Sequence, residues 1–143
     1  MAVQLADKGI QEFVRGWFAA LDRHADFAEL RSRVVDHGLE MKFPEGVFRE
    51  VDGLAKWYDN ALNLFFDEKH TFIDVRTDIA GDRATVTIKV NWKSRAWRPP
   101  EATSTWLDLV IDQQWEVVAG ENGPLIKTYV VGHVEPQPGS GTL

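Results

Sequence analysis

The sequence contains no cysteine, and this absence excludes several kinds of chemistry at once. Disulfide bridges, thiolate metal sites and a cysteine nucleophile all require a thiol. Proteins kept in a reducing compartment have no use for disulfides, so the composition fits a cytoplasmic protein and we expect that location.

Long apolar runs and an excess of positive charge are also missing. No apolar stretch approaches the roughly 20 residues that span a bilayer, and the opening segment MAVQLADKGIQEF lacks the basic and then apolar order of a secretory signal. The net charge is −6. We therefore expect no nucleic-acid or membrane partner, because such surfaces need clustered Lys and Arg.

Common cofactor and nucleophile motifs are absent too. The chain has no glycine-rich phosphate loop and no G-x-S-x-G pattern, so nucleotide binding and serine hydrolysis have no sequence support. The four histidines, His24, His37, His70 and His133, show no close ligand spacing. We expect neither a metal site nor another cofactor.

What the sequence does contain is typical of one globular domain. It has 143 residues, of which 44% are hydrophobic, and it is rich in aromatics with six Trp and eight Phe. That length is enough for a substantial core. We assign residues 1–143 to a single domain with its core at 8–134. The segment 135–143 is rich in Pro, Gly and Ser, and we predict a flexible tail there.

Hydrophobic periodicity predicts three helices before a sheet. Apolar residues recur at three- and four-residue steps between residues 7 and 23, which indicates an amphipathic helix with Asp7 as its N-cap. A short second helix is expected after Asp26. The segment 52–65 gives a third helix, with Asp52 as the candidate cap and Tyr58 on its apolar stripe.

Alternating patterns predict the strands. Residues 35–43 form a first strand and 46–53 a short return strand or turn, while the later chain alternates almost continuously. A turn at residues 80–83 joins the first two of four long antiparallel strands. Helices first and a strand meander afterwards indicate an α+β fold, in which the helices cover one face of a curved sheet.

Strand parity predicts which side chains face the helices. In the long strand around residue 111, Leu107, Leu109, Ile111 and their odd-numbered neighbours form the apolar face. Two polar side chains, His37 and Gln113, interrupt otherwise apolar inner faces. A buried polar group is costly unless it is hydrogen-bonded, so each needs a local partner or a wet cavity.

Four segments together resemble the nuclear transport factor 2-like superfamily, in particular its SnoaL-like, ketosteroid-isomerase-like and scytalone-dehydratase-like members. These segments are GWFAALDRHADFAEL, LEMKFPEG, GLAKWYDNAL and DIAGDRATVTIKVNW. The resemblance covers roughly residues 8–134. It implies a cone-shaped sheet wrapped around three helices, a deep pocket at the open end and a homodimer across the outer face of the sheet. Because the superfamily contains enzymes and carriers, it does not fix a function.

The residues that the resemblance places at a ketosteroid isomerase site differ here. The family's catalytic acid stands immediately before the turn proline, where this chain has Phe43, and its tyrosine donor aligns with Trp17. For the third position, Gln113 or Gln114 fits better than Asp112. Phe43 cannot accept a proton, and this disfavours simple ketosteroid isomerase activity.

Other residues are candidates for a site. His37 is the candidate base and Tyr58 a candidate hydrogen-bond donor, although for each of them a core residue with a local partner is the favoured interpretation. The candidate substrate-binding residues are Trp17, Phe43, Trp57, Trp92, Gln113 and Trp115, of which any single Trp can instead be core filling.

Two carboxylate patterns have simpler interpretations. Asp74 and Arg76 share strand parity with His70 and resemble the Arg–Asp pair of epoxide hydrolases with this fold, but a surface or interface pair is the favoured interpretation. Asp108 and Asp112 share the polar face of their strand, as carboxylates on a solvated sheet face do.

Two functional hypotheses follow. The first is a cofactor-free lyase or isomerase, such as a dehydratase or cyclase, that acts on a small cyclic or aromatic molecule in an aromatic-lined pocket. The second is a non-catalytic module that binds a small molecule or dimerises. Under both hypotheses we expect a homodimer, since Trp106, Val110 and Val118 interrupt the polar outer face of the sheet.

Overall fold

The computed structural model describes residues 4–143 as three helices and one six-stranded sheet. The helices are α1 (Asp7–Asp22), α2 (Phe27–Arg31) and α3 (Glu50–Leu64). The strands are β1 (Glu40–Phe43), β2 (Gly46–Arg49), β3 (Phe65–Ala80), β4 (Arg83–Ala96), β5 (Thr105–Ala119) and β6 (Pro124–Pro136). The predicted α+β class is confirmed.

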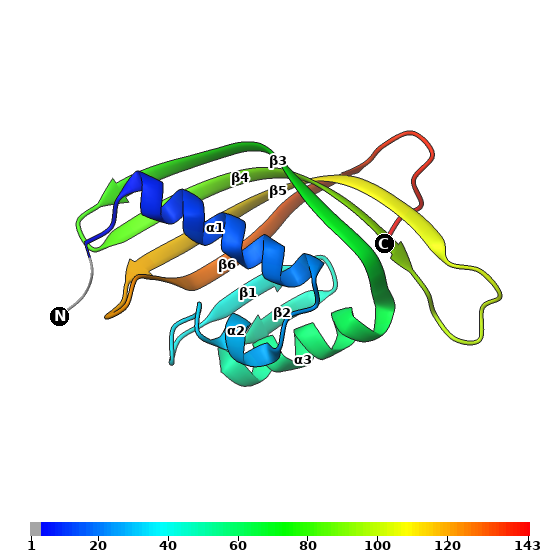
Figure 1. Ribbon diagram of the computed structural model, residues 1–143, viewed down its shortest axis with the longest axis horizontal. Coiled ribbons are helices and arrows are strands. Elements are labelled where there is room, and N and C mark those ends of the chain that lie inside the picture. Colours follow the sequence, from blue (N-terminus) through cyan, green and yellow to red (C-terminus); the bar gives the residue numbers. More distant parts are fainter. Residues whose placement is uncertain (1–3) are drawn as a thin grey trace.

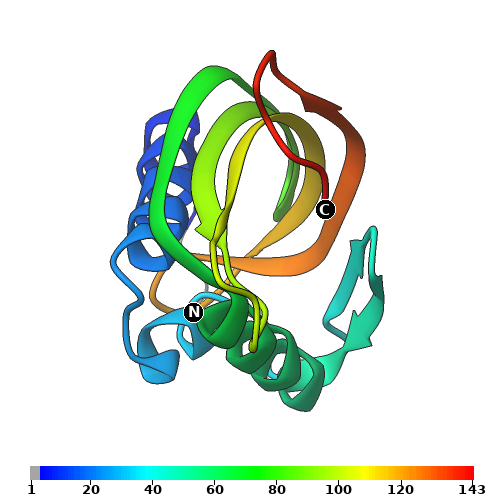
Figure 2. The same cartoon turned by 90° about the vertical axis from the view of Figure 1, so that its right-hand side faces the viewer.

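The sheet is strongly curved and holds the helices on its inner side. Its strand order is β2-β1-β6-β5-β4-β3, and only β1 and β6 pair in parallel, so the sheet is mixed and mostly antiparallel. In Figure 1, α1 lies along the concave side of the long strands, and α3 runs beneath and leads directly into β3. Figure 2 shows the long strands arching above α3, with α1 on one side and the β1–β2 hairpin on the other.

The predicted sidedness of the long strands is confirmed. In β4 the buried residues alternate from Ala84 to Trp92, and in β5 they alternate from Leu107 to Val117. These faces meet α1, whose stripe includes the fully buried Trp17 and Phe18. The core is therefore an aromatic-rich layer between α1 and the concave face of the sheet, as period-2 and period-3.6 patterns require.

The first predicted strand is wrong over residues 35–39. Regular strand begins only at Glu40, and Val34 makes a single isolated bridge to Ile126. Gly38 has a φ of +84°, which breaks the extended path, and its N–H donates to the Glu50 carboxylate at 2.6 Å. The side chains before this turn therefore do not continue the in-and-out alternation that Leu39 and Met41 follow.

Two helix caps also differ from the prediction. Helix α3 begins at Glu50, two residues before the expected cap Asp52. Asp7 is the first helical residue of α1 rather than its cap, and its carboxylate accepts a hydrogen bond from the Thr77 hydroxyl. Both helix starts are set by packing of the apolar stripe, because neither cap residue makes a side-chain capping bond.

The segment after β6 is held against β5 instead of hanging free. The Gln137 N–H donates to the Asp108 carbonyl and the Gly141 N–H to the Trp106 carbonyl, both at 2.8 Å. The Ser140 hydroxyl accepts from the Asp108 N–H, also at 2.8 Å. These bonds replace the predicted flexible tail with an ordered return along the strand. Among residues 4–143, no helix is both long and apolar enough to cross a membrane.

Candidate functional site

A cavity opens on the concave side of the sheet, between α1, α3 and the long strands. The volume open to the centre of a water-sized molecule is about 90 Å³. Most of its walls are aromatic or aliphatic, and we call it the aromatic cavity. Its lining residues are Phe18, Leu21, Phe43, Pro44, Glu45, Trp57, Tyr58, Ala61, Leu62, Phe65, Glu68, His70, Trp92, Ile111, Gln113, Tyr129, Val131, Val134 and Leu143.

Aromatic rings form two walls of this cavity. Phe43 and Trp57 stack almost parallel, with centroids 4.8 Å apart and an interplanar angle of 5°. Phe65 meets the indole of Trp92 edge-on at 4.8 Å. Offset and edge contacts of this kind fix ring orientation as well as burying apolar area. The cavity is therefore shaped for a flat, largely apolar molecule.

A histidine and an aspartate meet at the wall formed by β3. The Nδ1 of His70 lies 2.5 Å from Oδ1 of Asp22, the last residue of α1, and the His70 backbone N–H donates to Oδ2 at 3.0 Å. The His70 side chain is only 7% exposed. Because the carboxylate engages Nδ1, it fixes the ring and leaves Nε2 as the nitrogen available for chemistry.

Aromatic neighbours also hold the His70 ring. Phe18 lies 4.7 Å from it between centroids, and Trp92 lies parallel to it at 6.0 Å with an interplanar angle of 15°. An imidazole that is paired with a carboxylate and clamped by two rings has the arrangement of an oriented general base.

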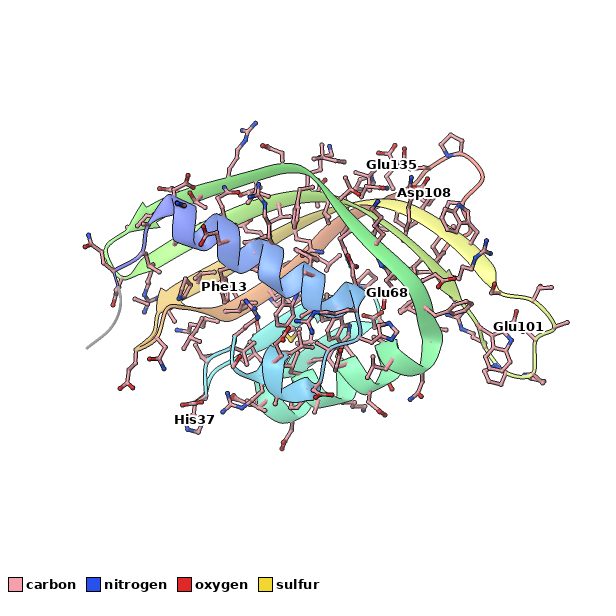
Figure 3. The ribbon with its side chains drawn as sticks, viewed as in Figure 1. Phe13, His37, Glu68, Glu101, Asp108 and Glu135 are labelled. Carbon is pink, nitrogen blue, oxygen red and sulfur yellow. The ribbon has the colours of Figure 1, made fainter. Side chains whose placement is uncertain are left out.

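A second acidic and basic pair lies beside the first. Glu68, two residues before His70 on β3, contacts the Nε2 of His24 through Oε2 and accepts the Trp92 indole N–H through Oε1 at 3.2 Å. Burial raises the pKa of the Glu68 carboxyl, and the bond to His24 opposes that rise. Figure 3 shows Glu68 inside the molecule, near the end of α1 and beneath β3.

Neutral polar groups complete the cavity. The Gln113 Oε1 accepts the Trp115 indole N–H at 3.1 Å, so the amide N–H₂ of Gln113 remains for other acceptors. Tyr129 is buried, and burial raises the pKa of its phenol, which stays protonated. The Tyr58 hydroxyl donates to the Ala25 carbonyl at 2.5 Å, and this local partner satisfies its proton.

The structure brings five of the eight sequence-predicted site residues to the cavity. These are Phe43, Trp57, Tyr58, Trp92 and Gln113. Trp17 and Trp115 are fully buried behind the wall, where their rings pack edge-to-face at 6.1 Å. The indole N–H of Trp17 is buried near the Tyr129 hydroxyl without an acceptor in good geometry. For these two tryptophans the core interpretation holds.

The inward placement of His37 is wrong. The chain bends at Gly38, His37 is exposed, and it does not line the cavity. Figure 3 shows His37 at the outer edge of the molecule, on the far side of α2 from the cavity wall. The alternation that pointed it inward applies only from Glu40 onward, because the turn at Gly38 changes the direction of the chain before the strand begins.

We expect His37→Asn to leave both the thermal stability and any activity unchanged, because the side chain is exposed and outside the cavity. Thermal melts and ligand titrations of the two proteins check this. A drop in activity without a drop in stability would restore His37 as a functional residue.

Sequence reasoning missed Asp22, Glu68 and His70. It gave His70 the parity of Asp74 and Arg76, but a register shift between Phe72 and Asp74 separates them. His70 therefore points inward, while the Asp74–Arg76 ion pair of 2.8 Å lies exposed on the outside, as predicted for that pair. A bulge adds one residue and reverses the parity beyond it. The signal that was available is an acidic residue ending the first helix, together with a histidine early in a strand.

No metal-ligating cluster accompanies these groups. Within residues 4–143, no three His, Asp or Glu side chains gather where they could hold a metal ion. Asp108 and Asp112 do not line the cavity. Asp108 accepts a hydrogen bond from the Asn91 amide at 2.7 Å on the other face of the sheet.

Solved structures share this fold at low sequence identity. The hexachlorocyclohexane dehydrochlorinase LinA-type3 from Novosphingobium barchaimii LL02 is 13% identical and covers 95% of this chain and 92% of its own, with a TM-score of 0.76. A nuclear transport factor 2-like superfamily protein from Salmonella enterica serovar Typhimurium is 15% identical over 94% and 96%, with a TM-score of 0.74. A ketosteroid isomerase-like protein from Erwinia carotovora atroseptica is 16% identical over 87% and 92%, with a TM-score of 0.70.

These identities establish a common fold and nothing finer. A search of the curated proteins found no match. A family model described as the SnoaL-like domain matches residues 4–128, which is most of the chain and includes α1 through β5 and part of β6. The protein therefore belongs to the SnoaL-like domain family.

Proposed function

We propose that this protein is a cofactor-independent lyase or isomerase that removes a proton from a small cyclic or aromatic substrate bound in the aromatic cavity. The observation that carries the proposal is the pairing of His70 with Asp22 at the cavity wall. A base must be oriented, shielded from bulk water and within reach of the substrate. The His70 ring meets the first two conditions by its carboxylate partner and its burial.

In this proposal the substrate ring lies against the Phe43–Trp57 stack, and Nε2 of His70 takes a proton from a carbon next to a carbonyl or leaving group. The electron pair of that C–H bond moves toward the carbonyl oxygen. Gln113 and Tyr129 supply amide and phenol groups in the same cavity, where they can stabilise developing negative charge. Asp22 keeps Nδ1 bonded and stabilises the imidazolium that forms.

The lining of the cavity supports a neutral substrate. Its described lining residues include Glu45 and Glu68 but no Lys or Arg. A carboxylate or phosphate ligand would therefore find no cation among these residues to compensate its charge. The named activities of a dehydrochlorinase and an isomerase-like protein with this fold are compatible with proton removal, although a shared fold does not carry an activity by itself.

Deuterium exchange into 2-tetralone, a flat bicyclic ketone with acidic C–H bonds, tests the proposal directly. We expect the protein to accelerate exchange at the carbons next to the carbonyl above the buffer rate, measured by proton NMR in D₂O. A panel that adds a β-hydroxy ketone and a β-halo ketone extends the test to the elimination of water or halide.

The alternative is a non-catalytic binding module. It is favoured by one observation, the local satisfaction of the Tyr58 hydroxyl by the Ala25 carbonyl, which leaves that tyrosine no free proton for the cavity. A module would bind the same ketones, as tryptophan fluorescence would show, without exchanging or converting any of them.

We also expect a homodimer through the outer face of the sheet. Trp106 is 37% exposed there with Arg95 stacked over its ring at 5.3 Å, while Ile73 is 54% exposed. Exposed large apolar side chains of this kind are typical of an interface. Sedimentation at micromolar concentration should give twice the 16.2 kDa chain mass, whereas a single species of that mass would exclude the dimer.

A further inference from the structure

We infer that Glu68 is a second catalytic group of the aromatic cavity: its carboxyl gives a proton to the substrate while His70 removes one, and His24 restores that proton from solvent. This inference rests on the proposed function, because it assigns the acid for the reaction in which His70 is the base.

The first support is position. Glu68 and His70 lie two residues apart on β3, and both line the cavity. His70 lowers the pKa of the Glu68 carboxyl and Asp22 raises it, so the His70–Asp22 pair and the Glu68–His24 pair are close enough to interact electrostatically. An acid and a base on one cavity wall can serve two atoms of one bound molecule.

The second support is the path to water. The Glu68 side chain is 9% exposed, whereas that of His24 is 31% exposed, and the two are in contact. A proton given up inside the cavity can therefore be replaced through the imidazole of His24 without opening the site. The other Glu68 oxygen accepts the Trp92 indole N–H, which fixes the direction of the carboxyl.

The third support is the backbone on both sides of this contact. Asp67 and His24 are two of the three non-glycine residues with positive φ among residues 4–143, at 54° and 51°. A register shift between Phe66 and Lys69 lies at the same place and turns Glu68 inward. Uncommon conformations of this kind persist only where the surroundings impose them, and they gather at functional sites.

The chemistry balances without a further reactant. His70 Nε2 takes the proton from carbon, and the C–H electron pair becomes the new C=C bond. The Glu68 proton goes to the carbonyl oxygen in an isomerisation, or to a departing hydroxyl, which leaves as water when its C–O bond breaks. In an isomerisation the enol then returns its O–H proton to Glu68 as His70 delivers its proton to a different carbon. After loss of water, the cycle closes when His24 reprotonates Glu68 and His70 loses its proton. Tyr58 cannot replace Glu68, since its hydroxyl is bonded to Ala25.

Whether Glu68 holds a proton can be measured without any substrate. The groups that act on it are His24 and His70, which lower its pKa, and burial and Asp22, which raise it. In protein labelled with ¹³C at glutamate Cδ, we expect the Glu68 signal to titrate at higher pH than the carboxyl of a free glutamate side chain. His24→Asn should move that titration higher still, because it removes a positive charge. A Glu68 signal that titrates like a free glutamate side chain and does not respond to His24→Asn would overturn the inference.

The catalytic role is tested with 2-tetralone exchange in wild type, Glu68→Gln and the control Glu101→Gln, whose side chain lies in the distant loop seen in Figure 3. Glutamine keeps the size of the side chain and cannot give up a proton. We expect Glu68→Gln to slow exchange at least 10-fold and to abolish the fall in rate that accompanies deprotonation of Glu68, while Glu101→Gln matches wild type.

The outcomes separate the two proposals. If wild type and Glu68→Gln exchange 2-tetralone at the same rate and with the same pH profile, Glu68 has only a structural role in its ion pair with His24. His70 would then remain the base. Binding of 2-tetralone by wild type with no exchange would count against the proposed function, and against the catalytic role of Glu68 with it.

Discussion

Replacing His70 with glutamine is expected to lower the rate of proton removal about 10²- to 10⁴-fold, the usual contribution of a positioned general base. Glutamine retains an N–H that can donate to Asp22, so the partner of the buried carboxylate is kept. The loss should therefore fall on the rate and only slightly on the melting temperature. Proton NMR of 2-tetralone exchange, together with thermal melts, measures both effects.

Asp22→Asn is the companion change. An asparagine amide can no longer act as the anionic partner of Nδ1, so the imidazolium loses its stabilising charge and the ring loses its fixed tautomer. We expect a large loss of rate here as well, with ligand affinity retained. His37→Asn is the matched control because that histidine is exposed and outside the cavity. Full exchange by a folded His70→Gln protein would end the assignment of His70 as base.

Replacing Trp115 with alanine is expected to destabilise the protein by about 3–5 kcal/mol, the range seen for large aromatic residues removed from a core. Its ring is fully buried, with centroids 4.8 Å from Tyr129 and 5.7 Å from Phe18. The change also removes the indole N–H that Gln113 accepts. A decrease in melting temperature of roughly 10 °C or more should follow.

Trp57→Ala supplies the contrast. Trp57 is half-buried at the cavity and stacks on Phe43. Its removal should weaken ligand binding more than it weakens the fold. Denaturant titrations and ligand titrations on the two variants separate the roles. If Trp115→Ala keeps nearly native stability but loses ligand binding, the core assignment is contradicted. Trp115 would then be a substrate-binding residue.

Local pattern was sufficient for the elements whose neighbours are adjacent in sequence. The stripe on α1, the turn at residues 80–83 and the alternating faces of β4 and β5 all follow from periodicity, because a repeating apolar position has only one way to be buried in a regular element. Gln113 was correctly placed on the cavity side for the same reason. The absence of cysteine excluded thiol chemistry, and the net charge of −6 argued against a nucleic-acid or membrane partner, before any fold was known.

The pattern failed where one residue interrupts a regular element. A strand alternates with a period of two, so a single bulge or a glycine turn reverses the side on which every later residue lies. Gly38 moved His37 to the outside, and the irregularities near Asp67 and Ile73 moved Glu68 and His70 to the inside. Neither Asp67 nor Ile73 is a residue type that marks a bulge in a sequence.

The sequence by itself thus determined the class of fold, the buried faces of α1, β4 and β5 and the aromatic character of the cavity. Only the tertiary structure decided which ionisable groups meet in it. Asp22 and His70 are 48 positions apart, and Glu68 and His24 are 44 apart. Each pair exists because the end of α1 packs against the beginning of β3. That contact depends on the curvature and the bulges of the sheet, which are set by long-range packing rather than by any local repeat.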